Sequence, residues 1–202
     1  MWARLLKPPS EQRESEQRKN GPMTTILAAL ALVPAIAQAT TANPQGAALN
    51  EFSNRLQAYL LLREELGRKL DPIASTVSAS DLQARQRALA AALRGARAGA
   101  KQGDLIPLPV QEQIRETVIS DFRGRTAAAK RASLEDVPIG AMPGINTDYP
   151  EEAALATMPA LLLARLPRLP DNLQYRFFGR HVVIVDGDVA IVVDYVRNAV
   201  PQ

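Results

Sequence analysis

The segment that best predicts the fold is LQYRFFGRHVVIVDGDVAIVVDYV, residues 173–196. β-branched and aromatic residues, which favour extended structure, fill three short runs at residues 173–178, 181–185 and 189–196. Turn-forming residues at 179–180 and 186–188 separate the runs. We therefore predict a three-stranded antiparallel meander. The Asp-Gly-Asp at 186–188 is typical of a hairpin turn, and a calcium loop would need more oxygen ligands.

Both faces of this predicted sheet are largely apolar. Alternation places Val183 and Val185 opposite Val182 and Ile184, and in the third run it places Val189, Ile191, Val193 and Tyr195 on one face. Three strands packed against helices need only one apolar face. Either the Pro-rich loop of residues 137–150 or a partner chain covers the second face, and an uncovered edge strand would be a template for strand addition. In the partner alternative, the contact residues include Val183, Val192 and Asp194.

Helical patterns precede the meander. One apolar face formed by Phe52, Leu56, Tyr59 and Leu60 predicts a helix from about residue 48 to 68. Ser80 and Gln83 match a capping box that would start a second helix, which Gly103 would end. The four-residue spacing of apolar side chains predicts a third helix from near Pro109, through Val110, Ile114, Val118 and Phe122. Shorter helices are expected at residues 126–136 and 158–165.

These elements predict an α+β fold, with an N-terminal helical hairpin or bundle of three to four helices packed on a C-terminal three-stranded antiparallel meander. The expected regions of this single domain, residues 40–202, are a helical region at 40–136, a Pro/Gly-rich loop with a short helix at 137–170, and the meander at 171–202. The three-stranded sheet alone could not bury its apolar residues, so the helices complete its core.

The N-terminus has the three parts of a secretory signal peptide. A basic flank precedes a short apolar run at residues 26–37, and Ala37-Gln38-Ala39 forms a small-x-small cleavage site. We predict cleavage after Ala39, which gives a periplasmic or secreted protein with no transmembrane helix in the mature chain. The start is either Met1 or Met23. If it is Met23, residues 1–22 are an upstream extension outside the protein, and the shorter leader loses its Lys and Arg residues. The competing interpretation is a buried Ala/Leu helix in a cytosolic protein.

Composition restricts the chemistry. The chain has 24 Lys and Arg against 21 Asp and Glu, but the first 39 residues hold five of the basic and three of the acidic residues, so the remainder has a net charge of +1. This balance gives no electrostatic argument for nucleic acid binding. The absence of cysteine excludes disulfides and thiolate sites, and a single histidine argues against a zinc enzyme. We expect no cofactor and no metal.

Two sets of polar residues are candidates for a site. His181 with Asp186 and Asp194 could suggest a charge relay, but no serine elbow accompanies them, and we interpret them as strand and turn residues. Basic residues form one face of the second helix and could bind an anionic envelope polymer: Arg87, Arg94, Arg97 and Lys101. The alternative is that this face pairs with acidic residues of a neighbouring element.

Four short motifs carry a resemblance: Gln-Gly-Asp at 102–104, Leu-Pro-x-Leu-Pro at 166–170, Tyr-Arg-Phe-x-Gly-Arg at 175–180 and Val-Val-Asp-Tyr at 192–195. With them the chain resembles a group of exported bacterial proteins to which no activity is assigned. The resemblance covers most of the mature chain, is strongest from residue 166 onward, and implies export and a bacterial source but no functional residue.

The sequence thus predicts a non-catalytic interaction or accessory module of the bacterial envelope. Its partner would be an envelope protein or an anionic envelope polymer, and a homo-oligomer is also compatible with the pattern. Because no catalytic motif stands out, we assign no catalytic residue. The alternative is an envelope hydrolase with a carboxylate site near the Pro/Gly loop. A deep pocket lined by two carboxylates would favour the hydrolase, and an exposed flat sheet face would favour the binding module.

Overall fold

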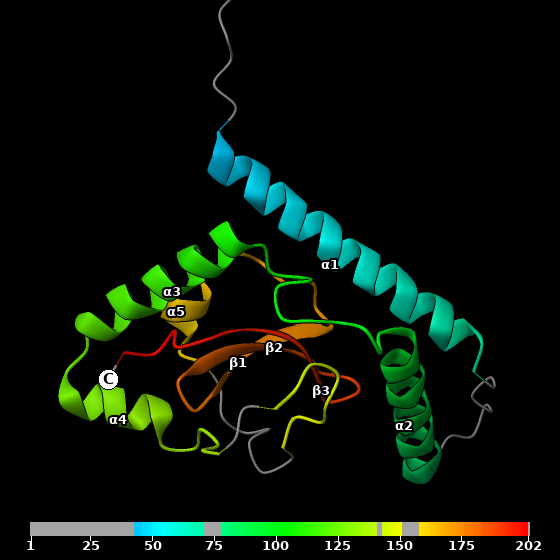
Figure 1. The fold of residues 1–202 in the computed structure, drawn as a ribbon. Coiled ribbons are helices and arrows are strands. Elements are labelled where there is room, and N and C mark those ends of the chain that lie inside the picture. Colours follow the sequence, from blue (N-terminus) through cyan, green and yellow to red (C-terminus); the bar gives the residue numbers. More distant parts are fainter. Residues whose placement is uncertain (1–42, 71–77, 141–142, 151–157, 202) are drawn as a thin grey trace, which may run out of the picture. The chain divides into compact units, whose positions relative to one another are not determined.

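The computed structural model describes residues 43–70, 78–140, 143–150 and 158–201. Within these residues, five helices and three strands follow one another (Figure 1): α1 (Pro44–Arg68), α2 (Ala79–Ala96), α3 (Leu108–Arg123), α4 (Ala127–Leu134), α5 (Ala160–Leu163), β1 (Leu173–Phe178), β2 (His181–Asp186) and β3 (Ile191–Val196). The predicted α+β class, with N-terminal helices contacting a C-terminal antiparallel sheet, is confirmed. The chain divides into two units, and the described residues all belong to the second, Thr41–Gln202. The predicted leader, with Ala37 and Ala39, lies outside the described residues.

The sheet is a simple meander in the order β1-β2-β3, with both neighbouring pairs antiparallel. A two-residue turn joins β1 to β2, so that Phe178 pairs with His181. The turn between β2 and β3 is longer than the sequence predicts, because β3 begins at Ile191 rather than at Val189. Ala190 has a left-handed φ of 52°, which extended strand backbone does not adopt.

A β-bulge in β3 changes which side chains share a face. Ile184 pairs with Asp194 and Val185 with Val192, so Val193 has no partner on β2. Because of this extra residue, Val193 packs with the main core while Tyr195 packs on the opposite face. The prediction that these two side chains point the same way is therefore wrong. Along β2 no bulge intervenes, and Val183 and Val185 do lie opposite Val182 and Ile184, as predicted.

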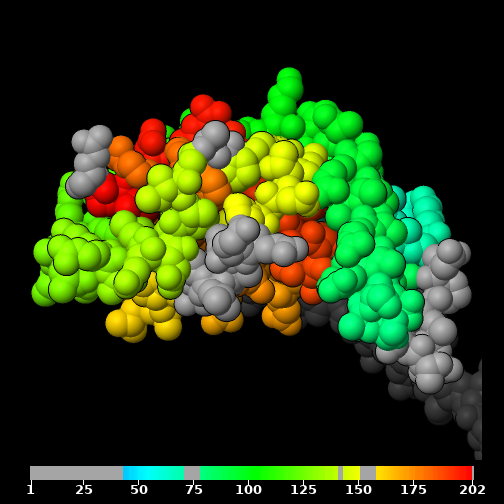
Figure 2. All heavy atoms as spheres, turned by 90° about the horizontal axis from the view of Figure 1, so that it is seen from below, coloured from blue at the N-terminus to red at the C-terminus, as the bar shows by residue number. Residues whose placement is uncertain are grey.

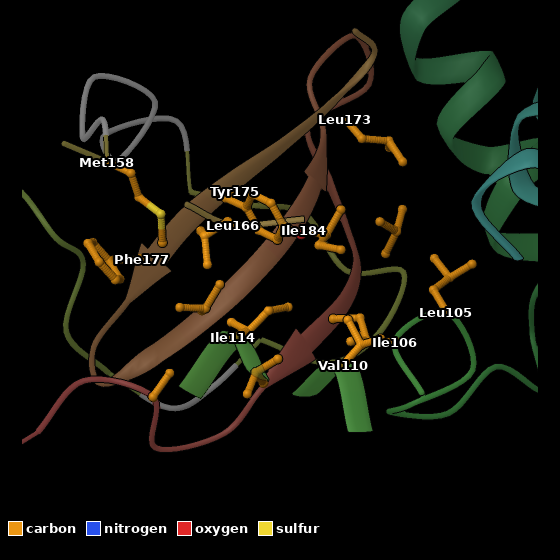
Figure 3. Close-up of a cluster of buried hydrophobic side chains, with 14 of the residues drawn as sticks. Leu105, Ile106, Val110, Ile114, Met158, Leu166, Leu173, Tyr175, Phe177 and Ile184 are labelled. Carbon is orange, nitrogen blue, oxygen red and sulfur yellow. The ribbon is translucent and has the colours of Figure 1, made fainter. Parts of the chain in front are cut away.

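The main core lies between one face of the sheet and the helices (Figure 3). The α3 side chains spaced four apart form one buried stripe, as their pattern predicts: Val110, Ile114, Val118 and Phe122. Phe122 meets Phe177 of β1 edge to face, with 5.9 Å between ring centroids. Each of these fully buried side chains contributes about 1.5–3 kcal/mol by leaving water, so α3 and the sheet stabilise each other.

Two helix boundaries differ from the sequence prediction. The capping box of α2 is formed by Ser78 and Asp81, not by Ser80 and Gln83, because the Ser78 hydroxyl accepts from the Asp81 N–H and the Asp81 carboxylate accepts in return. The helix ends at Ala96, well before Gly103. Gly103 instead has a φ of 91° in the loop that leads to α3. Within the described segments, no helix combines the length and apolar character needed to cross a bilayer.

Candidate functional site

Asp194, in β3, is a fully buried carboxylate. Its Oδ1 accepts from the main-chain N–H of Gly103 (3.0 Å) and of Tyr195 (2.7 Å). Its Oδ2 accepts from the N–H of Leu105 (2.9 Å) and of Ile106 (2.8 Å). Burial raises the pKa of this carboxyl, and the four N–H donors act against that rise. With every acceptor position facing a donor of its own chain, Asp194 fixes the loop before α3 and offers no surface to a partner.

Asp186 joins α1 to the sheet. Its Oδ2 accepts from the Tyr59 hydroxyl at 2.7 Å and from Arg63 Nε at 2.9 Å. Arg63 also pairs with Asp188, and the Asp188 N–H donates to Asp186 Oδ1. Burial, with the negative charge of Asp186 as a second cause, raises the pKa of Tyr59. The Asp-Gly-Asp segment therefore acts as a turn whose first carboxylate is bound by two α1 side chains.

His181 does not assemble with the two aspartates. It begins β2, whereas Asp186 ends the same strand and Asp194 binds the loop at residues 103–106. The Nδ1 atom of His181 accepts from the Asn198 N–H at 3.2 Å. Its pKa is lowered first by burial and then by Arg197 and Arg180. The interpretation of these three residues as strand and turn residues agrees with this geometry.

The second face of the sheet is covered by the chain itself. Residues 146–149 run along the outer edge of β3, where the Asn146 N–H donates to Val192 O (2.7 Å) and the Val192 N–H donates to Thr147 O (2.9 Å). Tyr149 then crosses the face, and its hydroxyl donates to Phe177 O at 3.0 Å. Beneath this cover Val183 and Val192 are fully buried.

The sequence left two alternatives for the second face, a partner chain or the loop of residues 137–150. In the structure, residues 146–149 of that loop cover the face. The residues predicted to contact a partner do not lie on a free surface, because Val183, Val192 and Asp194 all have an exposed fraction of 0%. A partner would have to displace Tyr149 to reach the two valines, and the loop at residues 103–106 to reach Asp194.

Half of the predicted basic face is also used within the fold. Arg94 donates to Asn146 O and pairs with Asp148. Arg97 donates to Asn146 Oδ1 (2.8 Å) and to Val193 O (3.0 Å), and its guanidinium lies 5.1 Å from the centre of the Tyr59 ring. These contacts hold the covering segment against α2, as Figure 2 shows where the yellow residues 143–150 lie against the green helix. Arg87 and Lys101 are exposed.

A cleft of about 600 Å³ lies between α2 and the β2–β3 turn. One wall consists of α2 side chains and the other of residues from the covering segment and the turn. The lining residues are Gln83, Gln86, Arg87, Ala90, Arg94, Asp148, Tyr149, Asp188, Val189 and Ala190. The volume falls in the range of small-molecule sites, and the polar groups include both hydrogen-bond donors and acceptors.

The charges in this cleft are unequally compensated. Asp148 is paired with Arg94 and Asp188 with Arg63. Arg87 instead donates a hydrogen bond of 3.4 Å to the Gln83 side-chain oxygen. The cleft therefore offers one guanidinium without a carboxylate partner among the described residues, surrounded by amides. In that same part of the chain, no group of three or more His, Asp or Glu side chains could hold a metal ion.

Comparison with protein-family models, with curated proteins and with solved structures gives no match to this chain. Any assignment of the cleft therefore depends on its own geometry. Sequence reasoning identified Arg87 and Arg94 as candidates but missed the glutamines, Tyr149 and the two aspartates. No local signal marks these residues, because they are brought together from three distant segments of the chain.

Proposed function

We propose that this protein is an exported, non-catalytic binding module of the bacterial envelope, and that the cleft between α2 and the β2–β3 turn binds a segment of a carboxylate-bearing glycan such as peptidoglycan. The observation that carries the proposal is the lining of the cleft. Amide, guanidinium and carboxylate groups serve the many hydroxyls of a sugar chain, which both donate and accept hydrogen bonds. The uncompensated Arg87 suits a carboxylate of the ligand, which a guanidinium binds in a bidentate manner.

The fixed walls of the cleft support binding rather than chemistry. Arg94 and Asn146 attach the covering segment to α2, and Arg63 attaches Asp188 to α1. Such preorganised walls reduce the entropy lost when a ligand is ordered. The support for export is the leader sequence alone. Cleavage at the small-x-small site after the short apolar run would give a mature chain that starts at Thr40.

The binding experiment compares two charge-matched variants. Full-length protein is co-sedimented with insoluble peptidoglycan at increasing polymer concentration, and the bound fraction is measured. Arg87→Gln is expected to weaken binding about tenfold, the effect of losing one charge-assisted hydrogen bond of about 1.4 kcal/mol. The control, Arg123→Gln, removes an exposed arginine at the end of α3, outside the cleft, and is expected to bind like the wild type.

Two results would overturn the proposal for the cleft. One is the absence of saturable binding to the polymer by the wild type. The other is equal binding by the Arg87 and Arg123 variants, which would assign any affinity to net charge rather than to the cleft. Export is tested separately, by expressing the chain in a Gram-negative host and sequencing the N-terminus of the protein in the periplasmic fraction. A start at Thr40 is expected, and an uncleaved cytoplasmic chain would contradict it.

A second candidate function is an envelope hydrolase, favoured by the presence of Asp148 and Asp188 in the same cleft near the Pro/Gly loop. Each carboxylate already forms an ion pair with an arginine of the fold, Asp148 with Arg94 and Asp188 with Arg63, and both pairs hold the walls of the cleft. Release of soluble fragments from peptidoglycan by the wild type, lost in Asp188→Asn, would favour this function over binding alone. Wild-type binding without fragment release would favour the binding module.

A further inference from the structure

Basic side chains gather at the end of the sheet that lies away from the cleft. Arg180 is in the β1–β2 turn, His181 begins β2, and Arg197 follows β3. The pairing of Val182 with Val196 brings these positions together, and the Val200 N–H donates to Arg180 O at 3.0 Å. Since β2 runs from His181 to Asp186, about 17 Å of strand separates this cluster from the turn that lines the cleft.

Main-chain and ring contacts hold the arginines of this cluster. Arg180 Nε donates to Val200 O at 3.2 Å. Arg197 lies over the Tyr195 ring, 5.6 Å from its centre, and donates to the Tyr195 hydroxyl at 3.1 Å. Arg115 of α3 reaches the same region, with Nε 3.4 Å from Arg197 O. Each guanidinium has five N–H donors, so these contacts orient the side chains and leave further N–H groups for a ligand.

His181 adds a neutral donor between the two arginines. Because its Nδ1 accepts from the Asn198 N–H, the proton of the uncharged ring is assigned to Nε2. Arg180 directly precedes His181, and Arg197 directly follows Val196, the β3 partner of Val182, so the register brings both arginines to the end of the sheet where His181 lies. Burial and the charges of Arg197 and Arg180 lower the pKa of this imidazole. Across the described residues, no carboxylate forms an ion pair with Arg115, Arg180 or Arg197, so the positive charge of the cluster is not neutralised within that part of the chain.

We propose that Arg180, His181 and Arg197 form a binding site for a phosphate-type oxyanion, distinct from the cleft and independent of the function proposed for it. The register brings the three residues to one end of the sheet, and both arginines are exposed there. Their guanidinium N–H groups and the imidazole N–H can donate to the three exposed oxygens of a phosphate ester. An anion bound there would neutralise the cluster and would stabilise the protonated form of His181. Free phosphate esters and phospholipid headgroups present the same group, and the experiment separates them.

The single histidine of the chain makes the site directly observable. The imidazole signals are followed by NMR from pH 5 to 8, in sulfate and in sodium chloride of equal ionic strength. Sulfate is the probe because its charge is constant over this range. We expect sulfate to raise the pKa of His181 beyond the effect of chloride. Arg180→Gln and Arg197→Gln should each weaken the response about tenfold, whereas Arg123→Gln should not change it.

The source of the anion is resolved by adding methyl phosphate, or vesicles of phosphatidylglycerol, in place of sulfate. Saturable shifts with methyl phosphate and no sedimentation with vesicles would support a free phosphate ester. Sedimentation with vesicles that Arg180→Gln abolishes and Arg123→Gln retains would support a headgroup. The proposal is overturned if the His181 signals follow ionic strength alone in the wild type, a result that needs no variant. It is also overturned if folded Arg180 and Arg197 variants respond like the wild type.

Discussion

Replacing Asp194 by asparagine tests how strongly one buried carboxylate fixes the loop before α3. In the wild type, each carboxylate oxygen accepts from two main-chain N–H groups. An asparagine amide has one carbonyl oxygen, so in either orientation its NH₂ faces two N–H donors. Two buried donors without an acceptor cost about 1–3 kcal/mol each, or about 2–6 kcal/mol together. Removal of a buried charge recovers part of this cost. We therefore expect Asp194→Asn to lower the free energy of unfolding by about 3 kcal/mol.

The measurement is urea unfolding of the full chain, followed by circular dichroism at 222 nm. The control variant, Asp171→Asn, makes the same chemical change at an exposed position in the turn before β1, and it should alter the free energy of unfolding by less than about 0.5 kcal/mol. A loss below about 1 kcal/mol for Asp194→Asn would refute the reasoning. It would mean that the four hydrogen bonds only offset the cost of burying the charge.

Three further predictions concern the tyrosines. Tyr59→Phe should lower the free energy of unfolding by about 1.5 kcal/mol in the same urea experiment, because Asp186 loses one charge-assisted donor and keeps Arg63. Tyr149→Ala should uncover the second sheet face and increase binding of the dye ANS at neutral pH. Burial raises the pKa of Tyr59, Tyr149 and Tyr175. Absorbance at 295 nm should therefore report fewer than four tyrosinates at pH 11, until the chain unfolds. The raised phenol pKa values stabilise the fold below pH of about 10, and this contribution is lost as pH rises further.

Each of these predictions has a contrary outcome. An unchanged unfolding midpoint in Tyr59→Phe would show that Arg63 alone satisfies Asp186. ANS fluorescence equal to that of the wild type in Tyr149→Ala would show that other residues protect the second face. Ionisation of Tyr59, Tyr149 and Tyr175 with an ordinary pKa near 10, while the circular dichroism remains native, would contradict the burial of their hydroxyl groups.

The sequence predicted the α+β class, the meander and the buried faces of α1 and α3, because these depend on local periodicity. The register of β3 depends on a single extra residue, and alternation cannot detect it: Val193 and Tyr195 appear to share a face until the bulge separates them. The cap of α2 was placed two residues late because Ser80 and Gln83 match the same motif as Ser78 and Asp81.

The candidate site was less predictable than the fold. Arg87 and Asp188 are about a hundred positions apart in the sequence, yet both line one cleft. Their proximity follows from packing of α2 against the covering segment, which no local pattern encodes. Two arginines of the predicted basic face, Arg94 and Arg97, bind main-chain oxygens of residues 146 and 193. Basic residues at helical spacing therefore indicate a charged helix face, but not which of its side chains face solvent.

The meander follows all of the described helices in the sequence, and this order also determines when folding can be completed. Synthesis proceeds from the N-terminus, so α1 leaves the ribosome long before the strand that carries Asp186, its partner through Tyr59 and Arg63. The main-chain N–H groups of the loop before α3 likewise have no carboxylate to bind until Asp194 is synthesised, about ninety residues later. Until the last strand is released, the apolar stripes of the helices have no sheet to pack on. The nascent chain therefore cannot complete this core before β3 has emerged.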